Sequence, residues 1–447
     1  MRRMRVLAIL IAFTIVAAAC GDDDGGSTAD DTSTETSAGT ATSGEASGTD
    51  EEASSGGGGS IRLWLNGTDT PDDVVEFAIA EFNEVHPDVE VVFERQQWTG
   101  LVERLTTALS SSDTPDVVEL GNTQAQAFEA AGALEDLTAF REDLGGDDLL
   151  QSLLEAGTYE DQYYGVPYYA GARVVIYRTD LFAESGLEVP TTIEEMVVAA
   201  ETLMADNAGV PNFSGFYLPG RNWHAALSFL WEEGGDIATN ADGQWTGQLS
   251  SPESIAGLEL FKDIFTRANS APADSDDAAD YIAFCNGEVG MMPAPGWKPG
   301  QIVNPDDGCP EMEGNIGVFA LPGSDPGTTA PVFLGGSVIG VANNSENKEL
   351  AVDLVEIMIG TEYQSQMAET GLLPARTSLL ADVGGTDAAV AQAQAATNSR
   401  FVPSSENWAA VEAAFVLQDM LTSIAQGDDL SGTAAAADAA IEDILNG

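Results

Sequence analysis

The chain has 447 residues, of which 73 are Asp or Glu and only 16 are Lys or Arg, so its formal net charge at pH 7 is −57. A surface this acidic repels DNA, RNA and other polyanions, which excludes nucleic-acid binding, and it suits a protein exposed to high or variable salt. It also disfavours an anionic ligand, unless Arg173, Arg221 or Lys298 compensates locally.

Residues 1–19 have the pattern of a secretory signal peptide. Three arginines lie within the first five residues, and residues 6–19 are almost entirely apolar. That run is shorter than the roughly 20 apolar residues that span a bilayer, and it ends in small residues directly before Cys20. The Ala-Ala-Ala-Cys junction resembles the lipobox of bacterial lipoproteins. The resemblance implies that the sulfur of Cys20 carries a diacylglyceryl group and that cleavage makes Cys20 the N-terminus; an ordinary signal peptide is the alternative.

The stretch that follows, residues 20–60, has the composition of a tether. Residues 21–60 contain ten acidic residues and no basic ones, and nearly all the others are Gly, Ser, Thr or Ala. Such a segment buries too little apolar surface to offset its ordering entropy, so we expect it to be disordered. Two acyl chains suffice for stable anchoring. We therefore expect the folded body to be held outside the cell membrane by the lipid alone.

Strand and helix patterns alternate through the first part of the body, which begins near Ile61. Continuous apolar runs predict strands, and apolar residues at helical spacing predict helices. The predicted strands are 61–65, 89–94 and 115–120, and the predicted helices are 71–86, 101–109 and 124–131. This alternation predicts an α/β fold with a parallel, doubly wound sheet.

The rest of the body continues as a mixed α/β pattern without an internal repeat. Strands are predicted at 173–178 and within "IGVFALPG" and "GSVIGVA". The predicted helices are 192–205, 223–233, 252–268, 277–286, 347–358, 361–370, 387–396, 406–424 and 431–445. The 387 residues from Ile61 to the C-terminus suggest two domains.

Two cysteines remain once Cys20 is assigned to the lipid. Cys285 and Cys309 should form a disulfide in an oxidising compartment. Two free buried thiols are the alternative.

An ordered set of motifs resembles the extracellular solute-binding proteins of bacterial ABC importers, in the branch that contains the maltose-binding protein. The set includes "GVPY", "YRTDLF", "VPTT", "APGW" and "NKELAVDLVEIMIGTEYQSQMAETGLLPAR". The resemblance covers the whole body. It implies a two-lobed periplasmic-binding-protein fold of type II, with the ligand in the cleft between the lobes. It also implies delivery of the captured solute to a membrane permease pair.

The same motifs imply three chain crossings between the lobes. We expect them near Tyr168–Ala172, Asn315–Val318 and Leu373–Arg376. One lobe would then comprise 61–168 plus 318–373, and the other 173–314 plus 377–447.

Candidate ligand-binding residues follow from the position of ligands in doubly wound sheets, beyond the carboxyl ends of the strands. A neutral sugar needs aromatic plates for its C–H faces and polar side chains for its hydroxyls. The loops after the first three predicted strands supply Thr68, Asp69, Gln97, Trp98, Asn122 and Gln124.

The family resemblance adds residues from the other lobe. It implies ligand contacts by Asn222, Trp223, His224, Trp297 and Trp408. Arg173, just past the first crossing, could donate a forked pair of hydrogen bonds to hydroxyls. His224 is equally compatible with an interior histidine, while Trp64, Trp231 and Trp245 are expected to be structural. No lysine follows Gly67, and Gly171 replaces an acid of the maltose receptor, which points away from maltose itself.

We interpret the chain as the substrate-binding lipoprotein of an ABC importer that captures a neutral carbohydrate, acts as a monomer and is not an enzyme. A surface glycoside hydrolase, an adhesive lipoprotein and a receptor for a different small solute are the alternatives. No cofactor or metal is expected. Iron binding by the tyrosines at 163, 164, 168 and 169 is disfavoured, as is calcium binding at 274–281 or 304–309.

Overall fold

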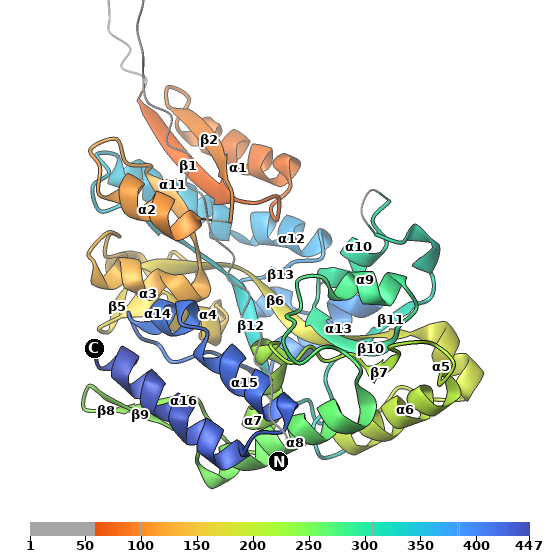
Figure 1. The fold of residues 1–447 in the computed structure, drawn as a ribbon. Coiled ribbons are helices and arrows are strands. Elements are labelled where there is room, and N and C mark those ends of the chain that lie inside the picture. Colours follow the sequence, from red (N-terminus) through yellow and green to blue (C-terminus); the bar gives the residue numbers. More distant parts are fainter. Residues whose placement is uncertain (1–58, 99, 306–307, 382, 384) are drawn as a thin grey trace, which may run out of the picture. The chain divides into compact units, whose positions relative to one another are not determined.

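The computed structural model describes residues 59–98, 100–305, 308–381, 383 and 385–447 (Figure 1). The predicted signal peptide, Cys20 and the predicted tether up to residue 58 lie outside the described residues. Within the described part, no helix combines the length and the apolar character needed to cross a bilayer.

A parallel three-stranded core with helices on both faces forms the region we call the first lobe. Its central strand is β1 (Ser60–Asn66), with β2 (Glu90–Gln96) on one side and β3 (Val117–Gly121) on the other. Leu63 and Leu65 alternate with Trp64 along β1, so that the two faces of the sheet enter two different hydrophobic clusters. The helices are α1 (Asp72–Val85), α2 (Leu101–Leu109), α3 (Asn122–Ala130), α11 (Lys348–Ile359) and α12 (Thr361–Glu369).

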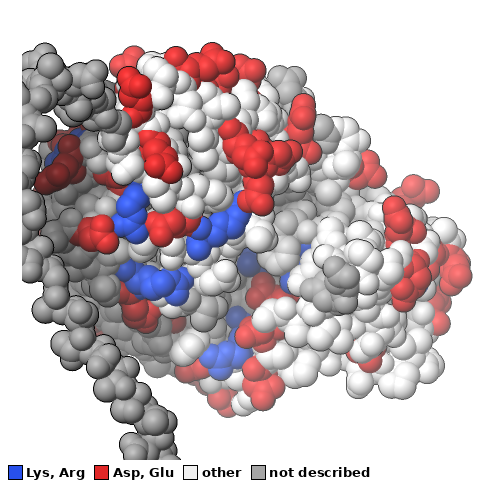
Figure 2. Space-filling model, turned by 90° about the horizontal axis from the view of Figure 1, so that it is seen from above, with Lys and Arg blue, Asp and Glu red and all other residues white. Residues whose placement is uncertain are grey.

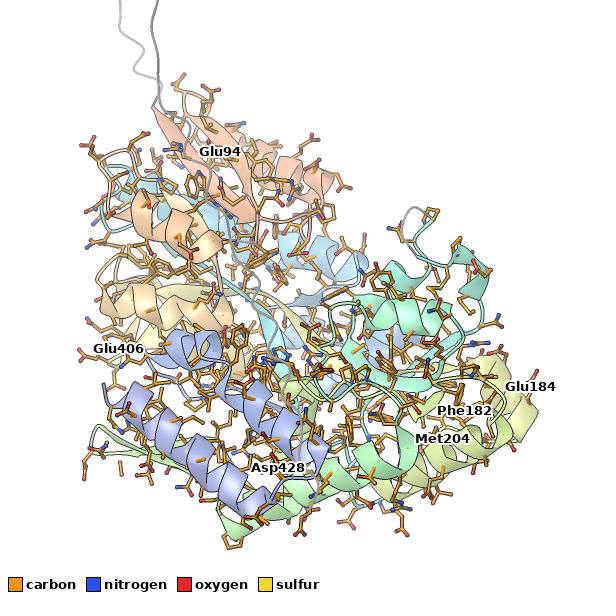
Figure 3. The ribbon with its side chains drawn as sticks, in the orientation of Figure 1. Glu94, Phe182, Glu184, Met204, Glu406 and Asp428 are labelled. Carbon is orange, nitrogen blue, oxygen red and sulfur yellow. A yellow bond between two sulfur atoms is a disulfide. The ribbon has the colours of Figure 1, made fainter. Side chains whose placement is uncertain are left out.

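The second lobe surrounds a smaller group of strands. They are β7 (Ser214–Phe216), β10 (Val289–Pro295) and β11 (Ile316–Phe319). The helices are α5 (Thr179–Ser185), α6 (Ile193–Asp206), α7 (Trp223–Glu232), α8 (Pro252–Ala268), α9 (Asp280–Cys285) and α10 (Lys298–Ile302). Phe182 of α5 and Met204 of α6, labelled in Figure 3, belong to this lobe's core. The helix α8 has its predicted bounds because Ser251 caps it by accepting from the Ser254 amide at 3.2 Å and Pro252 fills its first turn.

Two long strands run between the lobes side by side (Figure 1). They are β6 (Gly165–Arg178) and β12 (Val332–Val341), and they pair in antiparallel fashion from Leu334↔Ala172 to Gly340↔Gly165. The strand β12 is also antiparallel to β3, and the second half of β6 is antiparallel to β10 and β11. The sheet is therefore mixed. Among the described strands, the pairs β1–β2, β1–β3, β7–β10 and β12–β14 (β14 is Ser399–Arg400) are parallel, and the prediction of a parallel sheet is wrong for the others. Hydrophobic runs mark strands but not their direction.

The strand partners show where the chain passes between the lobes. The strand β6 changes partner from β12 to β10 between Ala172 and Arg173, and β13 (Leu373–Pro374) pairs with β6 at Ala170 and Tyr169. By contrast, the segment expected to cross near Asn315–Val318 pairs with the second-lobe half of β6 as β11. The passage comes later, along β12. The lobe bounds themselves stay a prediction, because Gly56–Gly447 form one compact unit.

Shorter elements and the C-terminal helices complete the fold. They are α4 (Gln151–Ala156), β4 (Thr158–Tyr159), β5 (Gln162–Tyr163), the hairpin β8 (Ala238–Ala241) and β9 (Gln244–Gly247), α13 (Asp387–Ala396), β14 (Ser399–Arg400), α14 (Trp408–Ala413), α15 (Val416–Gln426) and α16 (Leu430–Leu445). The single helix predicted over 406–424 is divided in two because Phe415 has a left-handed backbone, with φ of 54°. Its ring lies 5.3 Å from the Arg221 guanidinium.

The predicted disulfide is confirmed. Cys285 at the end of α9 is bonded to Cys309, with 5.5 Å between the Cα atoms, so the alternative of two free thiols is wrong. The bond closes the loop that contains β10, Trp297 and α10.

Candidate ligand-binding cavity

A cavity of about 1060 Å³ lies against the paired strands β6 and β12 and is lined by both lobes. Alternate residues of β6 face it, namely Tyr169, Gly171 and Arg173, as the two-residue period of a strand requires. Thr68 and Asp69 after β1 and Trp98 after β2 line it from the first lobe. Trp297 after β10 lines it from the second.

Glycine backbone of β6 and β12 forms the floor of this cavity. Gly171 of β6 lies opposite Gly335 of β12 in the antiparallel register. A Cβ atom added to Gly171 would meet no heavy atom within 4 Å, so the space above this residue is open. A flat ligand can therefore approach the two strands closely.

Trp98 forms an exposed aromatic plate that its neighbours hold in place. The indole Nε1 donates to Asp69 Oδ2 at 2.8 Å, and the hydroxyl of Tyr169 donates to the same oxygen at 3.0 Å. The ring lies against Gly67, where an added Cβ would come within 2.8 Å of Nε1. Although so constrained, the side chain remains 38% exposed. This rigidity favours binding because little side-chain entropy is lost when a ligand stacks on it.

Trp297 is the corresponding plate of the second lobe and is 53% exposed. The ammonium of Lys298 lies 4.9 Å from the centre of its ring and forms a buried ion pair with Asp280 at 2.8 Å. The preceding residue, Gly296, is pressed against Gln392 of α13, so closely that a Cβ there would overlap the Gln392 side chain. These contacts fix the start of the loop that carries Trp297.

The charges around the cavity leave no free cation among the described residues of its lining. Of these, Arg173 alone is basic, and its Nη1 donates to Asp277 Oδ2 at 3.0 Å. Burial alone would raise the pKa of Asp277, but Arg173 and the other cations nearby hold it below its usual value. The acidic residues of the lining are Asp69, Glu313, Glu369 and Asp387. The cavity therefore disfavours anions.

On the face of the molecule drawn in Figure 2, carboxylates are spread over the outer surface, and the fewer basic side chains lie mostly toward its recessed part.

A buried carboxyl group holds the cavity floor to the first lobe. Glu119 of β3 accepts from the Asn66 amide at 2.7 Å with one oxygen and from the Ser337 hydroxyl at 2.7 Å with the other. Burial raises the pKa of Glu119 to about 7, and these hydrogen bonds oppose part of that rise. The group thus joins the end of β1 to β12 next to Asp69 and Tyr169.

Five of the twelve predicted ligand residues line the cavity: Thr68, Asp69, Trp98, Arg173 and Trp297. Three others lie outside the lining in the first lobe. The Asn122 side chain is buried and donates to the Leu334 carbonyl at 2.9 Å, and the Gln124 side chain lies beside Gly121. Gln97 is exposed.

The remaining four predicted residues form a packed cluster behind Phe333, which itself lines the cavity. Trp223 stacks on His224 at 3.9 Å, and Trp408 lies 6.3 Å from Trp223 between ring centres. Trp408 is 1% exposed and Trp223 7%. Asn222 caps α7 by accepting from the Ala225 amide at 3.2 Å. These positions do not support direct ligand contact.

His224 belongs to this cluster as a partly buried histidine. Its ring lies 5.0 Å from that of Phe333. Burial, reinforced by the nearby Arg173, lowers the pKa of His224 well below its usual value, so the ring is neutral at pH 7.

Several lining residues were missed from the sequence. The most informative are Tyr169, Phe333, Gly335, Gly336 and Gln392. The alternation in "YYAGAR" could have identified Tyr169 together with Arg173, since residues two apart share a strand face. No local signal marks Gln392, which a distant helix brings to the cavity. Within the described residues, no cluster of three or more His, Cys, Asp or Glu could hold a metal ion.

Comparison with known proteins identifies the family. Residues 67–365 match the family of bacterial extracellular solute-binding proteins. The chain belongs to this family. It is 31% identical over 357 residues to the diacetylchitobiose binding protein DasA of Streptomyces coelicolor, which covers 79% of this chain and 82% of that protein. It is 24% identical over 293 residues to an arabinooligosaccharide-binding protein of Halalkalibacterium halodurans, covering 63% of each chain.

Solved structures of sugar receptors share the fold of this solute-binding protein. The MalE protein of Xanthomonas citri matches with a TM-score of 0.73 at 22% identity, over 86% of this chain and 97% of that one. The GacH receptor of Streptomyces glaucescens matches with a TM-score of 0.70 at 22% identity, over 87% and 98%. The predicted two-lobed periplasmic-binding-protein fold is confirmed.

Proposed function

We propose that this solute-binding protein captures an uncharged oligosaccharide in the cavity between its lobes and delivers it to the permease of an ABC importer. Closure of the lobes on the sugar is the state that the permease would recognise. The cavity volume of about 1060 Å³ has room for several sugar rings.

The observation that carries this proposal is the pair of exposed tryptophans, one from each lobe, on opposite sides of a glycine floor. Trp98 and Trp297 offer aromatic faces to the C–H faces of a sugar. Asp69 and Arg173 line the same cavity and supply hydrogen-bonding groups for hydroxyls. The absence of a free cation in the lining agrees with an uncharged ligand.

The relatives suggest which sugars to test first. DasA is named for diacetylchitobiose. Among the other matches, one protein is named for arabinooligosaccharides, and another was solved in complex with maltotetraose. A β-linked N-acetylated disaccharide is our first candidate, because DasA is 31% identical over most of both chains.

We further propose that the mature protein acts as a monomer anchored through a lipid on Cys20, with residues 20–60 as its tether. The Ala-Ala-Ala-Cys junction and the acidic, Gly/Ser-rich composition support this. Metabolic labelling with a radioactive fatty acid tests it: Cys20→Ser should abolish incorporation. Label retained in that variant would contradict the anchor.

The receptor function is tested by combining calorimetry with product analysis. The full chain should bind diacetylchitobiose, chitotetraose, maltotetraose or an arabinooligosaccharide at the main cavity, with a calorimetric stoichiometry of one sugar per chain for that site. The sugar should remain intact after prolonged incubation. Release of shorter sugars would favour the glycoside hydrolase alternative, which needs only two suitably placed carboxylates. Failure of every sugar to bind would contradict the carbohydrate assignment.

A further inference from the structure

The molecule has a second cavity of about 1010 Å³ that shares no lining residue with the first. The helix α13 separates the two. Asp387 and Gln392 toward its beginning line the first cavity, and Gln394 and Ala396 toward its end line the second. The lining of the second cavity also includes residues of α4 and of the β8–β9 hairpin, which are far apart in the sequence.

The walls of this second cavity carry the side chains that suit a polyhydroxylated ligand. Trp245 of β9 and Phe401 after β14 provide partly exposed aromatic surface. Gln151 and Gln394 provide amides, and the hydroxyls of Ser152 and Ser399 lie 3.1 Å apart. Aromatic faces flanked by amides and hydroxyls are the combination that recognises the apolar face and the polar edge of a sugar ring.

The position of Trp245 is fixed by a row of side chains on α16. The Asn446 amide group both accepts from the Trp245 backbone N–H at 2.8 Å and donates to the Trp245 carbonyl at 3.0 Å. One turn earlier, Glu442 accepts from the Gly247 amide at 2.9 Å, and Asp438 accepts from the Leu249 amide at 2.7 Å. The backbone of β9 is therefore held to the C-terminal segment, which fixes the point from which the Trp245 side chain enters the cavity wall.

The charges of the second cavity are also compensated. Among the described residues of its lining, Arg400 alone is basic, and it lies 3.4 Å from Asp236 Oδ2 and 5.7 Å from the centre of the Trp231 ring. Glu155 is the other acidic residue of the lining, and burial raises its pKa. No cation of the lining is left to attract an anion, so the walls favour an uncharged ligand.

We propose that this second cavity is an additional carbohydrate-binding site, in which a sugar ring stacks on Trp245 and its hydroxyls contact Gln151 and Gln394. The choice of sugar as ligand rests on the proposed function of the first cavity. The site itself rests on a separate set of residues.

The test is calorimetry of the full chain with diacetylchitobiose and chitotetraose at millimolar concentration. The wild type should show two classes of site. Trp245→Ala should remove the weaker class or lower its affinity at least tenfold and leave the tighter one unchanged, whereas Trp245→Phe should retain both. Trp297→Ala should remove the tighter class and leave the other.

A second variant covers the case in which Trp245→Ala fails to fold. Gln394 is exposed at the wall of the second cavity, so Gln394→Trp should fill this cavity without altering the core. It should remove or weaken the weaker class of sugar site, as Trp245→Ala does.

The outcomes separate the two proposals. A single class of site that Trp297→Ala removes, and that neither Trp245→Ala nor Gln394→Trp affects, would overturn the second site while the receptor function stands. Binding that only the Trp245 and Gln394 variants remove would support the second site and refute the assignment of the first. Absence of sugar binding in the wild type would overturn both.

Discussion

Two groups of aromatic residues were predicted for the same role, and the structure places them in opposite environments. Trp98 and Trp297 are 38% and 53% exposed at the cavity, whereas Trp408 and Trp223 are 1% and 7% exposed in the cluster behind it. The local neighbours account for the difference. Trp98 and Trp297 lie in loops after strands at the cavity, with Trp98 packed on Gly67, whereas Leu, Phe and Met side chains enclose the buried pair. We therefore propose that the same residue type serves ligand binding at the cavity and stability in the buried cluster.

The largest effect that distinguishes the two groups is expected for Trp408→Ala. Removing a fully buried indole should lower the free energy of unfolding by about 4 kcal/mol, because the transfer energy is lost and a cavity remains. It also removes the hydrogen bond from Trp408 Nε1 to Glu412 Oε1, which is 2.8 Å long. Urea unfolding measures the loss. The folded fraction of this variant should bind sugar with nearly unchanged affinity. A variant that keeps the stability of the wild type but no longer binds sugar would show that Trp408 belongs to the binding site.

The converse is expected for Trp297→Ala. This substitution should weaken sugar binding about 100-fold, equivalent to about 2.7 kcal/mol, and leave the melting temperature unchanged because half of the side chain is already exposed. Calorimetry and thermal unfolding measure the two effects. Trp245→Ala is the matched control, since it removes another partly exposed indole outside the main cavity. Unchanged affinity in the Trp297 variant would refute the cavity assignment.

The sequence predicts the environment of a residue well when its contacts are with residues nearby in the sequence, and poorly when they are with distant segments. The helices α2, α8 and α13 have their predicted bounds because local spacing and end signals determine them. Trp98 was predicted because it follows a predicted strand, and Trp297 because the family resemblance implied it; both line the cavity.

The buried cluster depends on contacts that local patterns do not contain. Trp408 meets Trp223 only because α14 packs near α7, a contact between segments about 185 residues apart. For the same reason, local patterns did not reveal that Phe333 and Gln392 line the cavity, or that the chain passes between the lobes along β12. No periodicity reports which distant strands will pair, or in which direction.

A smaller difference between the two groups concerns pH. Glu412 accepts from Trp408 Nε1, and the Thr123 hydroxyl of the first lobe lies 3.4 Å from its other oxygen. Burial raises the pKa of Glu412 to about 7, so the folded state holds a proton that the unfolded chain releases near its usual value. The stabilising contribution is therefore present below about pH 4.5 and is lost as the pH rises to about 7.

The variant Glu412→Gln should remove this dependence because glutamine mimics the protonated carboxyl. Relative to the wild type, it should gain about 3 kcal/mol of stability between pH 4.5 and pH 8. Urea unfolding of both proteins across this range measures the gain. Glu119 and Glu129 titrate in the same range in both proteins, so their contributions cancel in the comparison. Parallel stability curves would show that Glu412 is not buried as a neutral acid.

The smallest effect should come from the cavity floor, where stability and binding are expected to separate most cleanly. Gly171 has an ordinary strand backbone, and an added Cβ meets nothing within 4 Å, so Gly171→Val is compatible with the fold and suits a strand. Its methyl groups would nevertheless occupy the space next to Gly335, and sugar affinity should fall about tenfold, or 1.4 kcal/mol. Gly171→Ala, with a single methyl group, should lose at most threefold.

This graded pair of substitutions can refute the cavity assignment without any loss of stability. If calorimetry shows that the Val variant binds sugar as tightly as the wild type while its melting temperature is unchanged, the ligand does not lie on the floor between β6 and β12. If instead affinity falls in the order Gly, Ala, Val, the size of the side chain at this one position limits how closely the ligand approaches the floor. No substitution in the buried cluster around Trp408 should reproduce this graded loss of affinity.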